Sequence, residues 1–214
     1  NKGEENETMK KILALVLVLI MALGLAACAA PAAPAEEPTP AAEPETEKVD
    51  SQAILAELKT PAEESNWERT TSSQEVIDFL KVVAEHSAGR IILDTTTFAT
   101  EAGTPIPYMI ISDVAPASPA DVPEDKGVVY VNCNIHSGEI EGKESMMIFA
   151  REVAQGKHDD LLKDLVVIIV PNSNPDGNDN LGKNRITTQF TPKLVGTRAE
   201  GNGLNVNRDM TKQE

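Results

Sequence analysis

The chain has 214 residues and a formal net charge of −15 at pH 7, from 34 acidic and 19 basic side chains. This acidity argues against nucleic acid as a partner and against attachment to anionic lipid by charge, because both need clustered positive side chains. The chain has two cysteines, and Cys28 falls within the leading apolar segment, so Cys133 has no partner and a disulfide framework is excluded.

The beginning of the chain has the pattern of a secretory signal. We interpret residues 1–8 as upstream, non-native sequence before Met9, where two lysines and an apolar run over residues 12–27 follow. The run is shorter than the roughly 20 residues that span a bilayer, which favours a signal peptide over residues 9–28. It ends in Leu-Ala-Ala-Cys, which resembles the bacterial lipobox and implies lipidation of Cys28.

That resemblance implies an extracytoplasmic protein held to a bacterial membrane by its lipid. An ordinary signal peptide with an incidental cysteine, or a membrane anchor, stays open as the alternative. Residues 29–67 are rich in Ala, Pro, Glu and Thr and predict a disordered, semi-rigid linker, with a short helix at Ser51 to Lys59 as an open possibility. The folded domain is therefore expected over residues 68–214, beginning just after Trp67.

The domain is predicted to open with a helix. Ser72 and Glu75 have the spacing of a capping box, and apolar residues recur after them at helical spacing to about His86. Strands are expected at Ile91 to Thr97 and at Ile106 to Ser112, with turn residues between them.

A strand–helix–strand unit is predicted next. Gly127 to Ile135 reads as a buried strand rich in β-branched residues, and Glu139 to Gln155 has helical periodicity. Leu165 to Val170 is wholly apolar, as expected of a strand covered on both faces. The order of elements predicts an α/β fold.

His136 and Glu139 lie where the predicted strand passes into the helix, a place where α/β sheets form ligand crevices. An imidazole and a carboxylate three residues apart can converge on one metal ion, and they supply two of the three protein ligands of a catalytic zinc site. The alternative is a surface histidine near a helix start, with the glutamate favoured there by the helix dipole.

Other reactive side chains are assigned ordinary roles. Cys133 lies inside the predicted strand and is expected to be a buried core residue rather than a nucleophile or ligand. His86 and His158 are expected to be solvated surface residues.

Three motifs in order resemble the M14 family of zinc carboxypeptidases. They are His-Ser-Gly-Glu from His136, Asn-Pro-Asp-Gly from Asn174, and an arginine, Arg198, nine positions before the Asn-Arg pair that begins at Asn207. The resemblance covers about residues 68–214. It implies a carboxypeptidase-like mixed β-sheet flanked by helices, with Zn2+ as cofactor and peptides with a free C-terminal carboxylate as substrate.

The resemblance also implies roles for individual residues. His136 and Glu139 match the first two zinc ligands. Arg198 matches the arginine that polarises the scissile carbonyl, and Asn207 with Arg208 matches the pair that holds the substrate's terminal carboxylate. The Asn-Pro-Asp-Gly turn is expected to be scaffold.

Some features depart from the family pattern. Arg185 is a rival for the role of Arg198, and Gly138 stands where some members carry a substrate-binding arginine. The family's third zinc ligand and catalytic glutamate lie further along, whereas no histidine follows His158. We therefore expect the N-terminal part of a peptidase domain, truncated in its C-terminal half, that binds zinc weakly and is inactive alone. A related zinc amide hydrolase (a deacylase or cell-wall peptide amidase) and a non-catalytic peptide-binding lipoprotein stay open as alternative functions.

Overall fold

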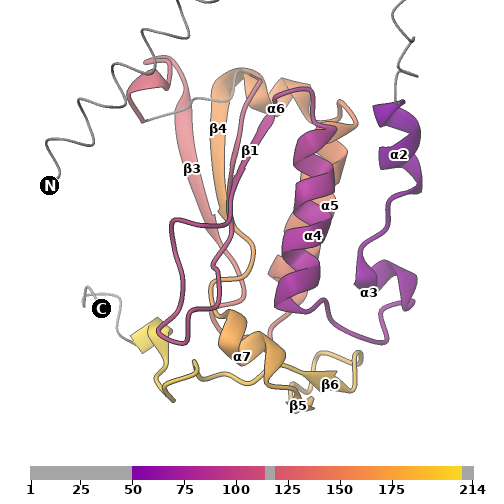
Figure 1. Ribbon diagram of the computed structural model, residues 1–214, viewed down its shortest axis with the longest axis vertical. Helices are drawn as coiled ribbons and strands as arrows, with labels where there is room; N and C mark the ends of the chain where they lie inside the picture. The colour runs from indigo at the N-terminus through magenta and orange to yellow at the C-terminus, as the bar shows by residue number, and fades with distance from the viewer. Residues whose placement is uncertain (1–49, 114–118, 209–214) are drawn as a thin grey trace, which may run out of the picture. The chain divides into compact units, whose positions relative to one another are not determined.

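A mixed β-sheet with helices packed against it forms the domain (Figure 1). The computed structural model describes residues 50–113 and 119–208. The predicted signal peptide at 9–28, its Cys28 and the linker up to residue 49 lie outside these ranges, as do residues 1–8. The α/β class predicted from the order of elements is confirmed.

The sheet has four strands in the order β1-β2-β4-β3. Strand β1 (Ile91–Asp94) pairs antiparallel with β2 (Tyr108–Ile111), which pairs antiparallel with β4 (Leu165–Val170). Strand β3 (Gly127–Asn132) runs parallel to β4, with Gly127 opposite Leu165. The parallel pair requires a crossover, and helix α5 between β3 and β4 supplies it.

Two helices lie side by side on one face of the sheet (Figure 1). Helix α4 (Ser73–Glu85) begins with the predicted capping box, in which Ser72 and Glu75 satisfy each other's backbone N–H groups. Helix α5 (Glu141–Ala154) starts two residues later than predicted. Their apolar faces meet the sheet in a buried core that includes Val76, Leu80, Val83, Met109, Ile111, Met147, Ala150, Val153 and Ile169.

Residues 50–67 differ from the disordered linker predicted there, and the short helix left open at Ser51 to Lys59 is present. Helices α2 (Ser51–Glu57) and α3 (Pro61–Glu64) are both capped at their N-termini, and Leu55 is completely buried in the core. Arg151 of α5 holds Glu63 through two hydrogen bonds of 2.7 and 2.9 Å. The apolar pattern of this segment is too short, and its composition too acidic, to predict that it packs on the domain. Its packing depends on contacts with residues about 90 positions further along the chain, such as Arg151.

Strand β3 is also not the buried strand that its composition predicts. Val128, Val129 and Tyr130 are exposed, whereas β4 alternates between buried and half-buried residues. In the described part of the chain β3 pairs on one side only, with β4, and burial depends on neighbours that composition does not reveal.

Strand β4 has the predicted bounds, whereas β1 ends at Asp94 rather than at Thr97 for a local reason. At the end of β1 the Asp94 carboxylate accepts the N–H groups of Thr96 and Thr97, both at 2.8 Å, and turns the chain out of the sheet. Asx turns of this kind compete with continued strand pairing.

None of the helices in the described ranges is long and apolar enough to cross a membrane. Several smaller elements complete the domain. They are α6 (Asp159–Asp164), α7 (Pro175–Asp179), the two-stranded sheet of β5 (Gly182–Lys183) and β6 (Leu194–Val195), and 3-10 helices at Pro119–Asp121 and Val206–Arg208.

Candidate active site

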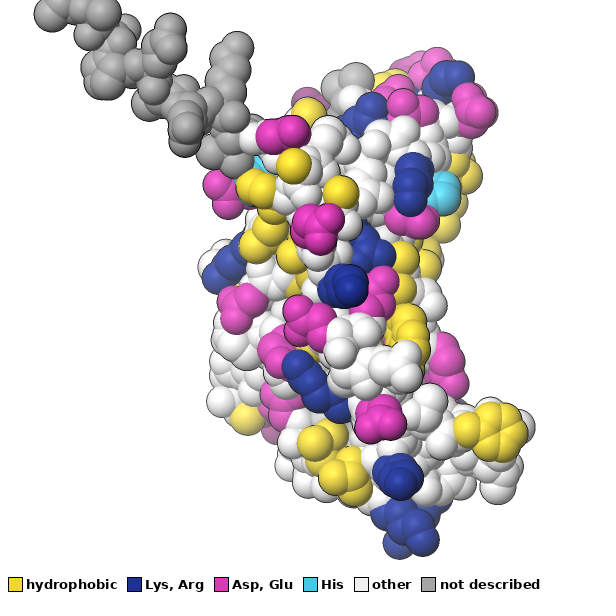
Figure 2. Space-filling model, turned by 90° about the vertical axis from the view of Figure 1, so that its right-hand side faces the viewer, with side chains coloured by type: hydrophobic (Ala, Val, Ile, Leu, Met, Phe, Trp, Pro, Cys, Tyr) yellow, Lys and Arg dark blue, Asp and Glu magenta, His cyan; other side chains and the backbone are white. Residues whose placement is uncertain are grey.

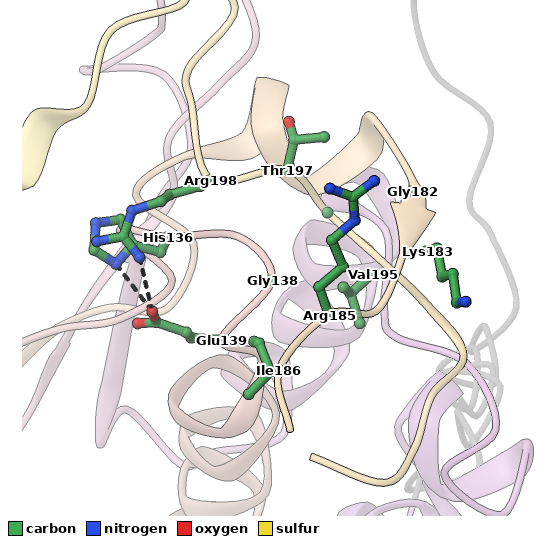
Figure 3. Close-up of a pocket in the computed structure, with 11 residues that line it drawn as sticks. His136, Gly138, Glu139, Gly182, Lys183, Arg185, Ile186, Val195, Thr197 and Arg198 are labelled. Atoms are coloured by element: carbon green, nitrogen blue, oxygen red, sulfur yellow. Dashed lines mark hydrogen bonds and ion pairs between the residues drawn. The ribbon is translucent and has the colours of Figure 1, made fainter. Parts of the chain in front are cut away.

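His136 and Glu139 meet in the turn that connects β3 to α5. The Glu139 N–H donates to the His136 carbonyl oxygen at 2.8 Å, and this tight turn brings the two side chains together. The imidazole Nδ1 lies 3.1 Å from Glu139 Oε1 (Figure 3). The His136 side chain is 7% exposed, whereas the Glu139 side chain is 54% exposed, so the histidine is held by the protein and the carboxylate faces solvent.

Hydrogen bonds from the Asn-Pro-Asp-Gly segment hold this turn in place. It forms helix α7 rather than a bare turn, capped by Asn174, whose Oδ1 accepts the Gly177 N–H at 2.9 Å. Asn174 Nδ2 donates to the Ile135 carbonyl oxygen at 3.3 Å, and Ser137 Oγ donates to the Asn174 carbonyl oxygen at 2.7 Å. These bonds flank His136 on both sides, in agreement with the scaffold role expected for the motif.

Arg198 reaches the same carboxylate from another part of the chain. Gly196 passes so close to α7 that a Cβ there would lie 2.5 Å from the Gly177 carbonyl oxygen, which only glycine permits. The Thr197 N–H donates to that oxygen at 2.8 Å. Arg198 Nη1 then lies 3.4 Å from Glu139 Oε1, and both side chains are half exposed (Figure 3).

The Asn-Arg pair is placed differently from the other motif residues. Asn205, two positions earlier, contacts the histidine, with its Oδ1 3.1 Å from His136 Nε2. Asn207 and Arg208 are exposed and make local bonds: the Asn207 N–H donates to Asn205 Oδ1, and Arg208 Nη1 donates to the Asn207 carbonyl oxygen. Sequence analysis did not single out Asn205, although it lies in the same motif as Asn207.

A pocket of about 480 Å3 opens beside these residues (Figure 3). His136, Glu139 and Arg198 line it, whereas Asn207 and Arg208 are not among its lining residues. Gly138, Ile186 and Val195 also line it, and they give it an apolar part. Lys183 and Arg185 line the opposite side, so both Arg198 and its rival Arg185 border the same pocket.

His136 and Glu139 fit a zinc ion as two donors. An imidazole nitrogen and a carboxylate oxygen are common zinc ligands, and here they already converge. Within residues 50–113 and 119–208, no group of three or more His, Cys, Asp or Glu side chains could hold a metal ion. The described residues thus supply two ligands and leave the third to be identified.

A buried polar cluster lies next to the site on the first turn of α5. Lys143 Nζ donates to Thr70 Oγ1 and to Asn178 Oδ1, both at 2.8 Å, and also to the Thr71 carbonyl oxygen. Glu144 accepts three bonds of 2.7 to 2.9 Å from Thr70 and Thr71. Both charged side chains are almost completely buried, and burial lowers the pKa of Lys143 against the opposing effect of Glu144.

The remaining candidates have the roles expected from the sequence, with one refinement. Cys133 is buried, and burial raises the pKa of its thiol, which disfavours the reactive thiolate. His158 is exposed and lies 2.9 Å from Glu152 Oε2. His86 is half-buried rather than solvated, because its Nδ1 lies 3.0 Å from Ser51 Oγ of α2.

Comparison with known proteins gives one family match. The family model described as "Zinc carboxypeptidase" matches residues 78–213. A search of curated proteins found no match.

Solved structures of carboxypeptidases are similar at low identity. A metallo-carboxypeptidase from Burkholderia cenocepacia is 20% identical with a TM-score of 0.47, over 67% of this chain and 34% of that one. Carboxypeptidase A from Helicoverpa armigera is 18% identical with a TM-score of 0.45, over 74% of this chain and 46% of that one. The chain thus covers less than half of the length of these structures.

Proposed function

Because the chain belongs to the zinc carboxypeptidase family, we propose that it forms part of the catalytic domain of a zinc-dependent metallocarboxypeptidase. Such an enzyme removes C-terminal residues from peptides. One observation carries the proposal: His136, Glu139 and Arg198, from two motifs about 60 residues apart, meet around one pocket.

His136 and Glu139 are the residues that would hold the metal. The zinc ion would lower the pKa of a bound water so that it can attack a peptide carbonyl at neutral pH. Asn205 and the bonds around Ser137 keep the imidazole in one orientation, as residues behind a metal ligand commonly do.

Arg198 would stabilise negative charge that develops on the carbonyl oxygen. Its guanidinium is a permanent cation at the pocket, and a positive group fixed where charge develops lowers the barrier more than it improves ground-state binding. The Glu139 carboxylate keeps this guanidinium beside the metal-binding residues.

Asn207 and Arg208 would hold the substrate's terminal carboxylate. The support is the motif and the exposure of Arg208, whose planar fork suits a carboxylate. Since neither residue lines the pocket, this role requires the substrate to extend from the pocket to the 3-10 helix at Val206–Arg208.

The test uses the full-length protein that contains this part of the catalytic domain, and it compares one peptide as free acid and as amide, with zinc content measured for each variant. His136→Ala should lose zinc and turnover. Arg208→Ala should keep zinc and lose about 2–5 kcal/mol of transition-state stabilisation for the free acid, or about 30-fold to several thousandfold in kcat/KM. Equal cleavage of acid and amide by the wild-type protein would contradict the carboxypeptidase assignment and favour a zinc amide hydrolase.

Lipidation of Cys28 would attach the enzyme to the outer side of a bacterial membrane. The support is the Leu-Ala-Ala-Cys sequence after a short apolar run. When expressed in a bacterium with labelled fatty acid, the wild-type protein should incorporate the label and Cys28→Ala should not. Failure of the wild-type protein to incorporate label would refute the anchor.

A further inference from the structure

The pocket is basic although the chain is strongly acidic. Of its lining residues, all in the described part of the chain, Glu139 alone is acidic, whereas Lys183, Arg185 and Arg198 are basic. Figure 2 shows Lys and Arg side chains gathered at the lower end of one face, at the level of β5 and β6, while the two signs are mixed over the rest of that face. A concentrated positive field of this kind attracts anionic ligands.

Two of these cations, Lys183 and Arg185, have no ion-pair partner among the described residues. Glu139 is shared by Arg198 and His136, at 3.4 and 3.1 Å. Among the residues that the structure describes, no carboxylate lies within ion-pair distance of Lys183 or Arg185. Because Glu139 is already engaged, it does not neutralise the exposed side chains of Lys183 and Arg185, which line the same pocket.

The backbone that carries these two cations is held firmly. Strands β5 and β6 pair Lys183 with Leu194, and the Asn184 N–H donates to the Lys193 carbonyl oxygen at 2.8 Å. The Asn184 amide donates to the carbonyl oxygens of Gln189 and Pro192, and its Oδ1 accepts the Ile186 N–H at 2.9 Å. Asn184 thus bridges the loop between the strands, which limits the entropy cost of presenting the adjacent Arg185.

Figure 3 shows Lys183 and Arg185 on the opposite side of the pocket from His136 and Glu139. A peptide whose scissile bond lies at His136 and Glu139 would therefore bring a neighbouring part of its chain to Arg185. The apolar lining from Gly138, Ile186 and Val195 lies between the two groups and suits the peptide backbone.

We propose that Lys183 and Arg185 select peptide substrates that carry an acidic side chain near the cleaved bond. This specificity deepens the proposed function and rests on it. The acidic side chain is distinct from the terminal carboxylate assigned to Asn207 and Arg208. The carboxylate of this acidic side chain would accept charge-assisted hydrogen bonds from Arg185, whose side chain makes none with the described residues.

The experiment measures binding by calorimetry at about 10 mM ionic strength, where charge is screened least. The probes are acetyl-Glu-Glu-Glu-Leu and acetyl-Gln-Gln-Gln-Leu, each as free acid and as amide. Wild-type protein should bind the Glu peptide about fivefold or more tightly than the Gln peptide, in both terminal forms. Arg185→Gln should remove most of this preference and Lys183→Gln a smaller part.

Lys163→Gln is the matched control. It removes the same charge from α6, where Lys163 pairs with Asp160 at the surface, and the preference should stay unchanged. Three results would each overturn the inference: equal binding of Glu and Gln peptides, an equal loss in Lys163→Gln, or an Arg185 effect that disappears when the peptide is amidated. The last would show that Arg185 binds the terminal carboxylate.

Cleavage of the same peptides separates this inference from the proposed function. If the free acids are cleaved but Glu and Gln peptides bind equally, the carboxypeptidase function stands and the acidic selectivity fails. If the Glu peptide binds preferentially through Arg185 but the acids and amides are cleaved equally, the carboxypeptidase function fails and the acidic site stands.

Discussion

Two ion pairs that involve the two ends of one short segment, Glu139 and Glu144, differ in their exposure to solvent. Glu139 faces Arg198 at 3.4 Å, and each side chain is 54% exposed. Five residues later Glu144 lies 3.3 Å from Lys143, and these side chains are 3% and 0% exposed. The chemical groups and separations are similar, so the difference lies in solvent.

The difference indicates what each pair does. A pair in water is screened and contributes little to stability, so its charges stay available to a substrate or metal. A buried pair must satisfy each charge with protein groups, and Lys143 and Glu144 bond Thr70, Thr71 and Asn178 from two other parts of the chain. The buried pair ties the first turn of α5 to α7 and to the segment before α4, and these elements position the exposed pair.

The largest expected effect is on the buried pair. Lys143→Met leaves the Glu144 carboxylate buried without its cation, and we expect the free energy of unfolding to fall by about 3–5 kcal/mol. Urea denaturation followed by circular dichroism measures this change. The exposed Lys163→Met should change it by about 0.5 kcal/mol or less. A loss below about 1 kcal/mol in Lys143→Met would remove the distinction between the pairs.

The next effect is on the exposed pair and on activity rather than stability. In the full-length protein, Arg198→Ala should lower kcat about 10²- to 10³-fold, with a smaller change in ground-state binding, because the role proposed for its charge is to stabilise the developing oxyanion. Its free energy of unfolding should change by about 1 kcal/mol or less. Steady-state kinetics and urea denaturation on the same variant test both expectations, and a large loss of stability with unchanged kcat would reverse the comparison.

The smallest effect concerns a third pair of intermediate exposure, Arg69 with Glu75 at the start of α4. The hydrogen bond from Arg69, with further bonds from Ser72, lowers the pKa of Glu75 from 4.5 to about 2. Because the folded state has the lower pKa, this contribution to stability is complete above about pH 4.5 and is lost as the pH falls towards 2. Since the pair is partly solvated, it contributes about 1 kcal/mol at most.

Glu75→Gln isolates that contribution because glutamine can keep the capping box. Compared with wild type, the variant should be less stable at about pH 6, and the difference should vanish at about pH 2. Urea unfolding curves at several pH values measure it. A difference that does not depend on pH would assign the effect to packing instead of charge.

Local patterns determined much of this domain. The helical spacing after Ser72 and the apolar run at Leu165–Val170 depend on interactions between near neighbours, and each predicts an element that is present. His136 and Glu139 come together for the same reason, because three residues and one backbone hydrogen bond suffice to join them.

Tertiary structure decided the features that depend on distant residues. Composition predicts burial for β3 and disorder before residue 68, whereas among the described residues β3 pairs on one side only and Leu55 is buried in the core. The contact of His136 with Asn205, and the position of Arg185 across the pocket, join segments about 50 to 70 residues apart. Periodicity and spacing describe interactions along the chain. Solvent exposure, and with it the difference between a buried and an exposed ion pair, arises only when separate segments pack against one another.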